Sequence, residues 1–361
     1  MNFNHSYWSA LRILLFPFSL IYYCVVWCRN RLYDFRLFQS ASFNLPIICV
    51  GNLSVGGTGK SPMVEYLVRL LREALPVATL SRGYKRKTKG YALANQQTNV
   101  LEIGDEPMLF HIKFPDVAVT VGEERLVAIP QLLHDRPQTR VVIMDDAFQH
   151  RAVKASLNIL LTDCSNLFTR DWYLPTGNLR DEKRSYRRAD IIVVTKCDPG
   201  MPVQKQEEYK KEIKPLAHQH LFFSAIRYGK PYHIIHKTNQ SIGPNVEVLL
   251  VTGIANPKPL KEYLQQTAAS HHQLSFDDHQ VFTIDDLKGI MEKFEAIPSR
   301  MKIILTTEKD AVRLAKFETI IRDLPFYVIP MEQEFLFNDA GRFNILIQNF
   351  IQNFSKTGLP D

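Results

Sequence analysis

The chain has 361 residues, of which 45% are hydrophobic and 22% charged, a composition that excludes a disordered chain, a collagen-like repeat and a small disulfide scaffold. Its 44 Lys and Arg outnumber 37 Asp and Glu, and the formal charge of +7 admits phosphates, nucleic acid or an anionic membrane as partners. The length suggests about two domains. The five cysteines show no metal-ligand spacing, so we expect reduced thiols in a cytosolic compartment.

The first element in the chain is an uncharged apolar stretch, residues 13–28, with the sequence ILLFPFSLIYYCVVWC. It is shorter than the ~20 residues that a spanning helix needs, and it lacks the cleavage site of a secretory signal. Tyr22, Tyr23 and Trp27 suit the headgroup zone of a bilayer, and Arg29 and Arg31 follow them. We therefore expect a membrane-associated interfacial helix; the alternative is a core helix of a soluble domain.

Short β-branched runs then alternate with helical patterns, which is typical of an α/β fold with a mainly parallel sheet. We predict strands at 46–50, 77–80, 117–121, 141–144, 157–161 and 191–194, and helices at 62–75 and 107–113. The pattern becomes polar and irregular from about residue 200 to 244. A second series of strands follows at 246–251, 301–305 and 326–329.

These patterns predict a P-loop NTPase-like, mainly parallel sheet domain followed by a second, smaller α/β domain. We divide the chain into the membrane-associated helix region 1–40, the P-loop domain 41–220, a linker 221–245 and a C-terminal domain 246–361.

The strongest chemical signal is a buried-type strand that runs into the glycine-rich loop SVGGTGKS. Its backbone N–H groups can surround phosphate oxygens, Lys60 can reach the β- and γ-phosphates, and the Ser61 hydroxyl can ligate Mg²⁺. The usual pattern has Gly where Ser54 stands, so the loop is a variant. The nucleotide-binding residues that we predict are Ser54, Val55, Gly56, Gly57, Thr58, Gly59, Lys60 and Ser61.

Two acidic residues follow the apolar strand predicted at 141–144. Asp145 ends this strand and is the better candidate for a Mg²⁺ ligand beside the phosphates, and Asp146 is a second candidate, acting through a water. With Ser61, they form the predicted metal set. A turn is the alternative for an Asp at a strand end.

Eight segments, in order, resemble the motifs of the tetraacyldisaccharide 4'-kinase family of lipid A biosynthesis. They are GNLSVGGTGKSP (51–62), LSRGY (80–84), GDEP (104–107), DDAFQH (145–150), GNLRD (177–181), TGIANP (252–257), FDDH (276–279) and TEKD (307–310). The family's own loop has the variant first position. The resemblance covers most of the chain.

The resemblance implies Mg²⁺-dependent transfer of the ATP γ-phosphoryl group to the 4'-hydroxyl of a tetraacylated glucosamine disaccharide 1-phosphate, a lipid A precursor, at the cytoplasmic face of the inner membrane. By resemblance, Asp105 is the base that takes the acceptor's proton, working with His279 of the second domain, and Lys60 stabilises the transferring group. Position alone leaves Asp105 open as a helix N-cap and His279 as a solvated side chain.

The same resemblance places further side chains around the substrate and its phosphates. They are Tyr84, Arg125, Gln149, His150, Arg180 and Asp181. The family usually has Glu where Asp181 stands. The other cations of 180–188 are expected to form a solvated or membrane-facing surface.

Two alternatives use the same phosphate loop. Thr195-Lys196-Cys197-Asp198 fits the [NT]-K-x-D pattern with which GTPases read guanine, so a GTPase switch or delivery protein is the first alternative. A nucleic-acid-binding ATPase is the second. The basic tracts lack interleaved aromatics, so we expect no nucleic-acid partner.

Overall fold

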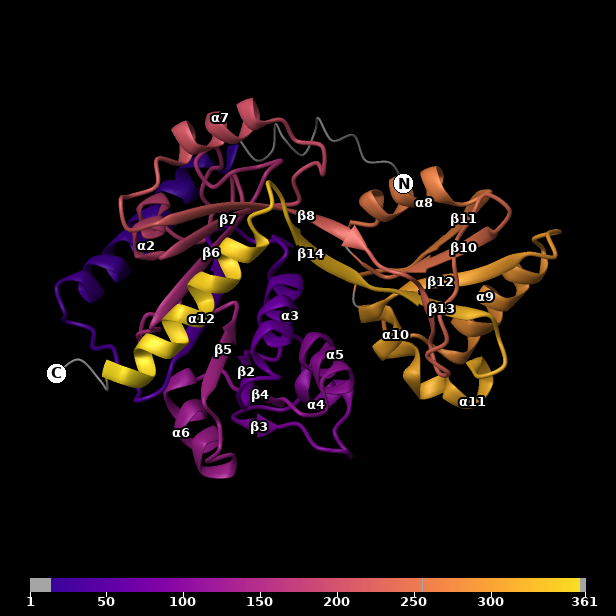
Figure 1. Cartoon of the computed structure of the whole chain (residues 1–361), viewed down its shortest axis with the longest axis horizontal. Helices are drawn as coiled ribbons and strands as arrows, with labels where there is room; N and C mark the ends of the chain where they lie inside the picture. Colours follow the sequence, from indigo (N-terminus) through magenta and orange to yellow (C-terminus); the bar gives the residue numbers. More distant parts are fainter. Residues whose placement is uncertain (1–13, 255, 279, 358–361) are drawn as a thin grey trace.

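The computed structural model describes residues 14–254, 256–278 and 280–357, and these residues form two α/β parts side by side (Figure 1). A large sheet forms the core of the first part and a smaller one that of the second. The predicted α/β class is confirmed, and each predicted strand is present with its ends shifted by no more than two residues.

The large sheet has the strand order β14-β8-β7-β6-β1-β5-β2-β4-β3, parallel except at its two edge strands. Its central strands are almost entirely apolar because both faces of the sheet are covered by helices. The bounds are β1 Ile47–Asn52, β2 Val77–Ser81, β3 Ala92–Leu93, β4 Ala118–Val121, β5 Val141–Asp145, β6 Leu157–Asp163, β7 Ile191–Thr195, β8 His220–Tyr228 and β14 Met331–Phe335.

Helices cover both faces of this sheet. Helices α3 (Lys60–Leu71), α5 (Asp105–Lys113) and α12 (Ala340–Thr357) contribute to one apolar core, and α6 (Arg125–Asp135) and α7 (Val203–Ile213) to the other. The short α4 (Val100–Ile103) and the 3₁₀ helix η1 (Lys183–Arg188) lie in connections.

The small sheet has the order β11-β10-β12-β13-β9, with only β9 antiparallel. Its strands are β9 Tyr232–His233, β10 Glu247–Thr252, β11 Ser270–Ser275, β12 Lys302–Thr307 and β13 Phe326–Ile329. Its helices are α8 Lys258–Thr267, α9 Ile284–Glu295, α10 Glu308–Leu314, η2 Ala315–Phe317 and α11 Glu318–Ile321.

The chain crosses between the two parts twice, and this corrects the predicted boundaries. It leaves the large sheet after β8 and returns after β13, and the two crossings touch where the Gly229 amide donates to the Pro330 carbonyl oxygen at 3.0 Å. Residues 221–245 therefore hold most of β8 and all of β9 rather than a linker. Residues 331–357 lie with the first part, because β14 pairs with β8. The polar edge strand MEQEF lacks the apolar run that identified the other strands.

Helix α2 (Phe16–Asp34) lies on the surface of the first part with its polar side toward the protein. The buried Ser19 hydroxyl donates to Tyr173 O at 3.0 Å, and Asn30 donates to Asp181 and Glu182. Phe18, Ile21 and Val25 are 59–62% exposed on the other side. The helix is therefore not a core helix. Within the described residues, no helix combines the length and apolar character needed to cross a bilayer.

Phe343 of α12 tests whether the last segment belongs to the first part. Its ring is fully buried and lies 4.4 Å from Phe335 and 5.3 Å from Phe222, between centroids. Phe343→Ala should lower the free energy of unfolding by about 3–5 kcal/mol, measured by denaturant titration. Ile345→Ala, on the exposed side of α12, is the control and should change it by less than about 1 kcal/mol. Equal effects would contradict this packing.

Candidate active site

The phosphate loop lies between β1 and α3, at the carboxyl edge of the large sheet. Gly59 has φ of 81°, a left-handed conformation that favours glycine, and α3 begins at the next residue. A Cβ added at Gly56 or Gly57 would meet no atom within 4 Å, so the loop's backbone is open to a ligand. Lys60 Nζ lies 3.5 Å from Gly56 O. The first amide groups of α3 and this ammonium group make an anion site.

Asp145 and Asp146 follow β5, which pairs directly with β1. Asp146 Oδ2 accepts from Arg180 Nη1 at 3.1 Å, and Lys60 Nζ lies 3.7 Å from Asp146 Oδ1. Although burial opposes ionisation, the Arg180 hydrogen bond and the Lys60 charge lower the pKa of Asp146. Asp145 is buried, and its Oδ1 has no partner among the described residues. Burial, then the negative charge of Glu106, raises the pKa of Asp145 to about 7.

The sequence did not single out Glu106, which lies in the GDEP segment. It accepts a hydrogen bond from the Ser61 hydroxyl at 2.8 Å and from Lys309 Nζ. The Lys309 charge and both hydrogen bonds lower the pKa of Glu106 against the effect of its burial. Its place beside the loop's hydroxyl makes it a further candidate metal ligand, and its position next to Asp105 is the signal that could have found it.

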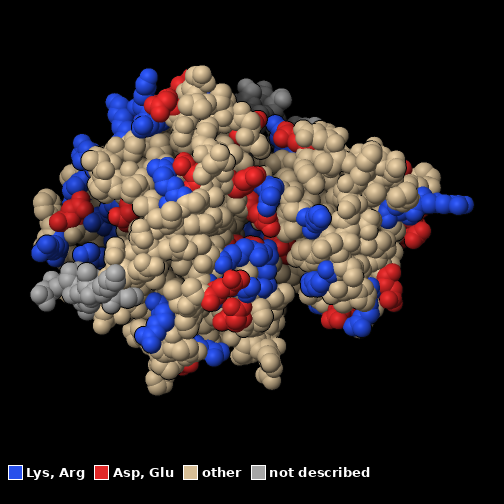
Figure 2. Space-filling model, viewed as in Figure 1, with Lys and Arg blue, Asp and Glu red and all other residues tan. Residues whose placement is uncertain are grey.

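Ion pairs join α5 of the first part to α10 of the second. Asp105 Oδ2 accepts from Arg313 Nε at 2.9 Å and Nη2 at 2.6 Å. Glu106 pairs with Lys309, and Lys113 pairs with Glu308. Figure 2 shows acidic and basic side chains gathered along the boundary of the two parts. The TEKD segment (307–310) thus supplies contacts to α5.

Asp105 is the first residue of α5, and Gly104 is its N-cap, with no side-chain capping bond. The Asp105 carboxylate instead meets Arg313, whose Nη1 also donates to Gly253 O at 3.1 Å. A Cβ on Gly253 would lie 3.0 Å from Asp277 O, so the FDDH loop runs beside this cluster. His279 lies outside the described residues, and its pairing with Asp105 stays a prediction.

Tyr84, Arg125 and His150 surround the same edge. A Cβ on Gly104 would lie 2.9 Å from Tyr84 O, so the LSRGY and GDEP loops touch. The buried Arg125 has two nitrogens, Nε and Nη2, without a partner among the described residues, and burial lowers its pKa to about 10. Burial and the charges of Arg125 and Arg82 lower the pKa of His150 to about 4. His150 is therefore neutral near pH 7, and Arg125 has donors available for an anion.

Gln149, Arg180 and Asp181 divide into two groups. Gln149 Nε2 donates to Asn52 O at 2.8 Å, and Arg180 pairs with Asp146, so both lie at the phosphate loop. Asp181 is only 1% exposed and accepts from Asn30, Ser185 and Arg188 at 2.8–3.0 Å. These contacts hold α2 in place, and the buried Asp181 carboxylate is not exposed to a substrate.

The donor set fits a magnesium nucleotide. Ser61, Glu106, Asp145 and Asp146 present hard oxygen atoms, and buried Thr58 Oγ1 and Asp145 Oδ1 have no partners among the described residues. The described part of the chain contains no cluster of three His, Cys, Asp or Glu side chains that could hold a metal ion.

Comparison with known proteins gives consistent results. The family model "Tetraacyldisaccharide-1-P 4'-kinase" matches residues 11–352. The chain is 44% identical to the tetraacyldisaccharide 4'-kinase of Bacteroides thetaiotaomicron, covering 94% of this chain and 93% of the relative, and 43% identical to that of Flavobacterium johnsoniae, covering 95% and 98%. The crystal structure of LpxK from Aquifex aeolicus in complex with ATP has a TM-score of 0.74 and 28% identity, covering 94% of this chain and 99% of that one.

These similarities support the kinase and not the GTPase alternative. In the tetrapeptide of that alternative, Lys196 Nζ pairs with Asp163 at 2.9 Å, and Asp198 Oδ1 accepts from the Gly200 amide at 2.7 Å. Thr195 Oγ1 donates to Thr58 O at 2.9 Å, so this segment supports the phosphate loop.

Asp145 gives a pH-dependent prediction for the metal-free protein. Its raised pKa means that the folded state keeps its proton up to about pH 7, while the unfolded state loses it near pH 4, so stability falls as pH rises between these values. Asp145→Asn cannot ionise, so at pH 8.5 its free energy of unfolding, measured by thermal denaturation, should exceed that of wild type by on the order of 2 kcal/mol, with little difference at pH 4. Asp116→Asn, on the surface, is the control. A difference independent of pH would contradict this assignment.

Proposed function

The chain belongs to the tetraacyldisaccharide-1-P 4'-kinase family, and we propose that it transfers the γ-phosphoryl group of ATP to the 4'-hydroxyl of a tetraacylated disaccharide 1-phosphate, a lipid A precursor. The observation that carries this proposal is the convergence of four features at one sheet edge: the phosphate loop, Asp145 with Asp146, the Asp105–Glu106 pair and the buried Arg125.

Each group has a task in this proposal. Loop amides and Lys60 hold the β- and γ-phosphates, and Arg180, placed by Asp146, contacts the transferring group. Ser61, Glu106, Asp145 and Asp146 would hold Mg²⁺, which would neutralise phosphate charge when bound. Tyr84, Arg125, Gln149 and His150 contact the acceptor. Asp181 is placed here as a positioning residue.

Asp105 acts as the base. The acceptor oxygen forms a bond to the γ-phosphorus, the bond from that phosphorus to the ADP oxygen breaks, and the hydroxyl proton passes to the Asp105 carboxylate. Two hydrogen bonds from Arg313 fix the position of this carboxylate, and His279 assists it. Because Arg313 comes from the second part, docking of the two parts completes the site.

Asp105→Asn should separate the chemical step from nucleotide binding. It keeps the shape of the side chain and removes its basicity, so kcat should fall about 10²–10⁴-fold while the Kd for ATP with Mg²⁺ changes little. Phosphate transfer in detergent and equilibrium ATP binding give the two values. Lys60→Met should impair both, and Asp116→Asn, just beyond the same helix, neither. Parallel loss of binding and turnover in Asp105→Asn would assign Asp105 to the nucleotide site instead.

We further propose that α2 holds the protein on the anionic cytoplasmic face of the inner membrane as a peripheral protein. Its polar side is bonded to the protein, whereas Phe18, Ile21 and Val25 of the helix and Leu14 just before it, spaced three or four residues apart, are 59–73% exposed. Trp172, 59% exposed, extends this surface through its edge-to-face contact with Phe16. An apolar stripe of this kind fits the acyl–headgroup boundary of a bilayer.

Ile21→Asp with Val25→Asp should abolish most flotation with vesicles of anionic phospholipid, because two charges would enter the apolar layer. Folding should persist, since both side chains point to solvent. Met301→Asp, an exposed apolar residue of the second part, is the control and should float like wild type. Unchanged flotation of the double variant would overturn this placement.

A further inference from the structure

A cavity of about 260 Å³ opens between the C-terminal end of α2 and η1. Its lining shares no residue with the catalytic, nucleotide or metal sets described above. It is nevertheless close to them: Arg188, which lines it, donates to Phe148 O at 2.9 Å, and the adjacent Gln149 donates to Asn52 O at the end of β1. The cavity therefore lies one loop away from the phosphate loop.

Arginine dominates this lining. Five arginines face two carboxylates there, Asp34 and Glu182. Asp34 accepts from Arg31 at 2.7 Å and from Arg151 at 2.8 Å. Glu182 accepts from Asn30 at 2.9 Å. The acidic groups are thus already paired, and the lining keeps an excess of three positive charges.

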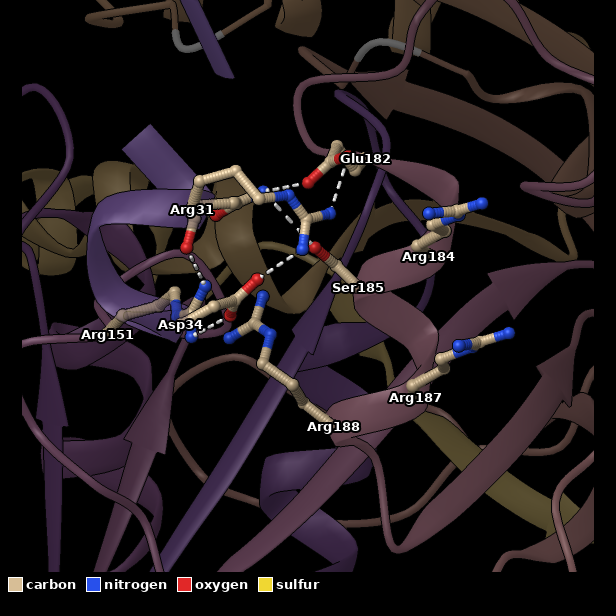
Figure 3. A pocket seen from close by; sticks show the side chains of 9 residues that line it. Arg31, Asp34, Arg151, Glu182, Arg184, Ser185, Arg187 and Arg188 are labelled. Carbon is tan, nitrogen blue, oxygen red and sulfur yellow. Dashed lines mark hydrogen bonds and ion pairs between the residues drawn. The ribbon is translucent and has the colours of Figure 1, made fainter. Parts of the chain in front are cut away.

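The side chains of Arg184 and Arg187 have no partner among the described residues. Both are exposed, and within the described chain neither guanidinium group forms a hydrogen bond or an ion pair. They are three residues apart in a 3₁₀ helix, where such side chains lie one above the other. In Figure 3, the Arg31–Asp34–Arg151 network lies on one side of η1, and the Arg184 and Arg187 side chains extend from η1 on the side away from that network. The Arg188 side chain lies beside Asp34 in the same view, and its buried Nε has no partner among the described residues.

The position of the cavity, close to the exposed apolar stripe of α2, favours a lipid headgroup as its ligand. It begins at Asn30, about one helical turn beyond the last residues of the exposed apolar stripe of α2. A membrane that holds this stripe brings headgroups to the cavity. The volume suits a headgroup and excludes a whole acylated disaccharide. Guanidinium groups bind phosphate through paired hydrogen bonds.

We propose that this arginine pocket binds the phosphate group of a lipid headgroup. The proposal rests on the lipid-kinase function proposed above and adds a second phosphate site to it. Two sources carry this chemistry: the 1-phosphate of the acceptor itself and the phosphate of a surrounding anionic phospholipid. The first would orient the disaccharide with its other sugar toward Asp105, and the second would orient the whole enzyme on the membrane.

The test uses the full-length double variant Arg184→Ala/Arg187→Ala, whose side chains make no contact needed for folding. Lys211→Ala/Arg300→Ala removes the same charge from exposed positions elsewhere and is the matched control. One arm measures KM and kcat in neutral detergent for acceptors with a 1-phosphate or a 1-hydroxyl group. The other measures sedimentation with phosphatidylcholine vesicles, with and without phosphatidic acid, and needs no catalysis.

A rise of about tenfold in KM for the 1-phosphate acceptor alone, with kcat unchanged, would assign the pocket to the acceptor. An unchanged KM with about tenfold weaker binding to phosphatidic acid vesicles alone would assign it to the surrounding lipid. No change in either arm, or equal changes in the control variant, would overturn the proposal. If wild type phosphorylates neither acceptor, the proposed function fails, and the vesicle arm still decides whether the pocket binds phosphate.

Discussion

The candidate site depends on a balance of charge at one sheet edge. Four carboxyl groups lie close together here, those of Asp105, Glu106, Asp145 and Asp146. Negative charges held close together oppose one another's ionisation, which raises their pKa values. Lys60 and Arg180 balance Asp146, whereas Arg313 and Lys309 of the second part pair with Asp105 and Glu106. Among the described residues, no ion pair joins Asp145 to a cation, and burial, then the negative charge of Glu106, raises its pKa to about 7. The second part of the protein therefore contributes positive charge to the nucleotide site. A bound divalent cation would neutralise the remaining negative charge of the carboxylates.

Helix α2 has the reverse of the usual polarity of a surface helix, and its packing explains why. Ser19, Tyr22 and Asn30 satisfy polar groups of the loop that carries Arg180 and Asp181, and Phe18, Ile21 and Val25 on the opposite side are exposed within the described part of the chain. The same contacts connect the exposed apolar surface of α2 to the backbone of Arg180, which lies beside the phosphate loop. The placement of α2 and that of Arg180 therefore depend on one short segment of chain.

The sequence predicted the elements that local residue patterns indicate. It did not predict the strand and the site residues whose roles depend on contacts with distant parts of the chain. Local patterns predicted strands β1 and β5, the glycine-rich loop and Asp145. Apolar runs indicate buried parallel strands, and closely spaced glycines indicate tight turns. Strand β14 could not, because its alternation of polar and apolar residues becomes a strand only against β8. Glu106, Lys309 and Arg313 escaped for the same reason: their roles depend on a partner about 200 residues away in the chain. Asp181 was predicted beside the substrate because the motif places it next to Arg180, whereas its side chain turns toward Asn30.

The paired crossings at Gly229 and Pro330 give the second part the topology of an insertion. Because its entry and exit strands are neighbours, the whole segment between them could be replaced by a tight turn without rethreading the large sheet. The ion pairs between α5 and α10 lie on the boundary of the two parts, so any separation of the two helices would remove Arg313 and Lys309 from their carboxylates together.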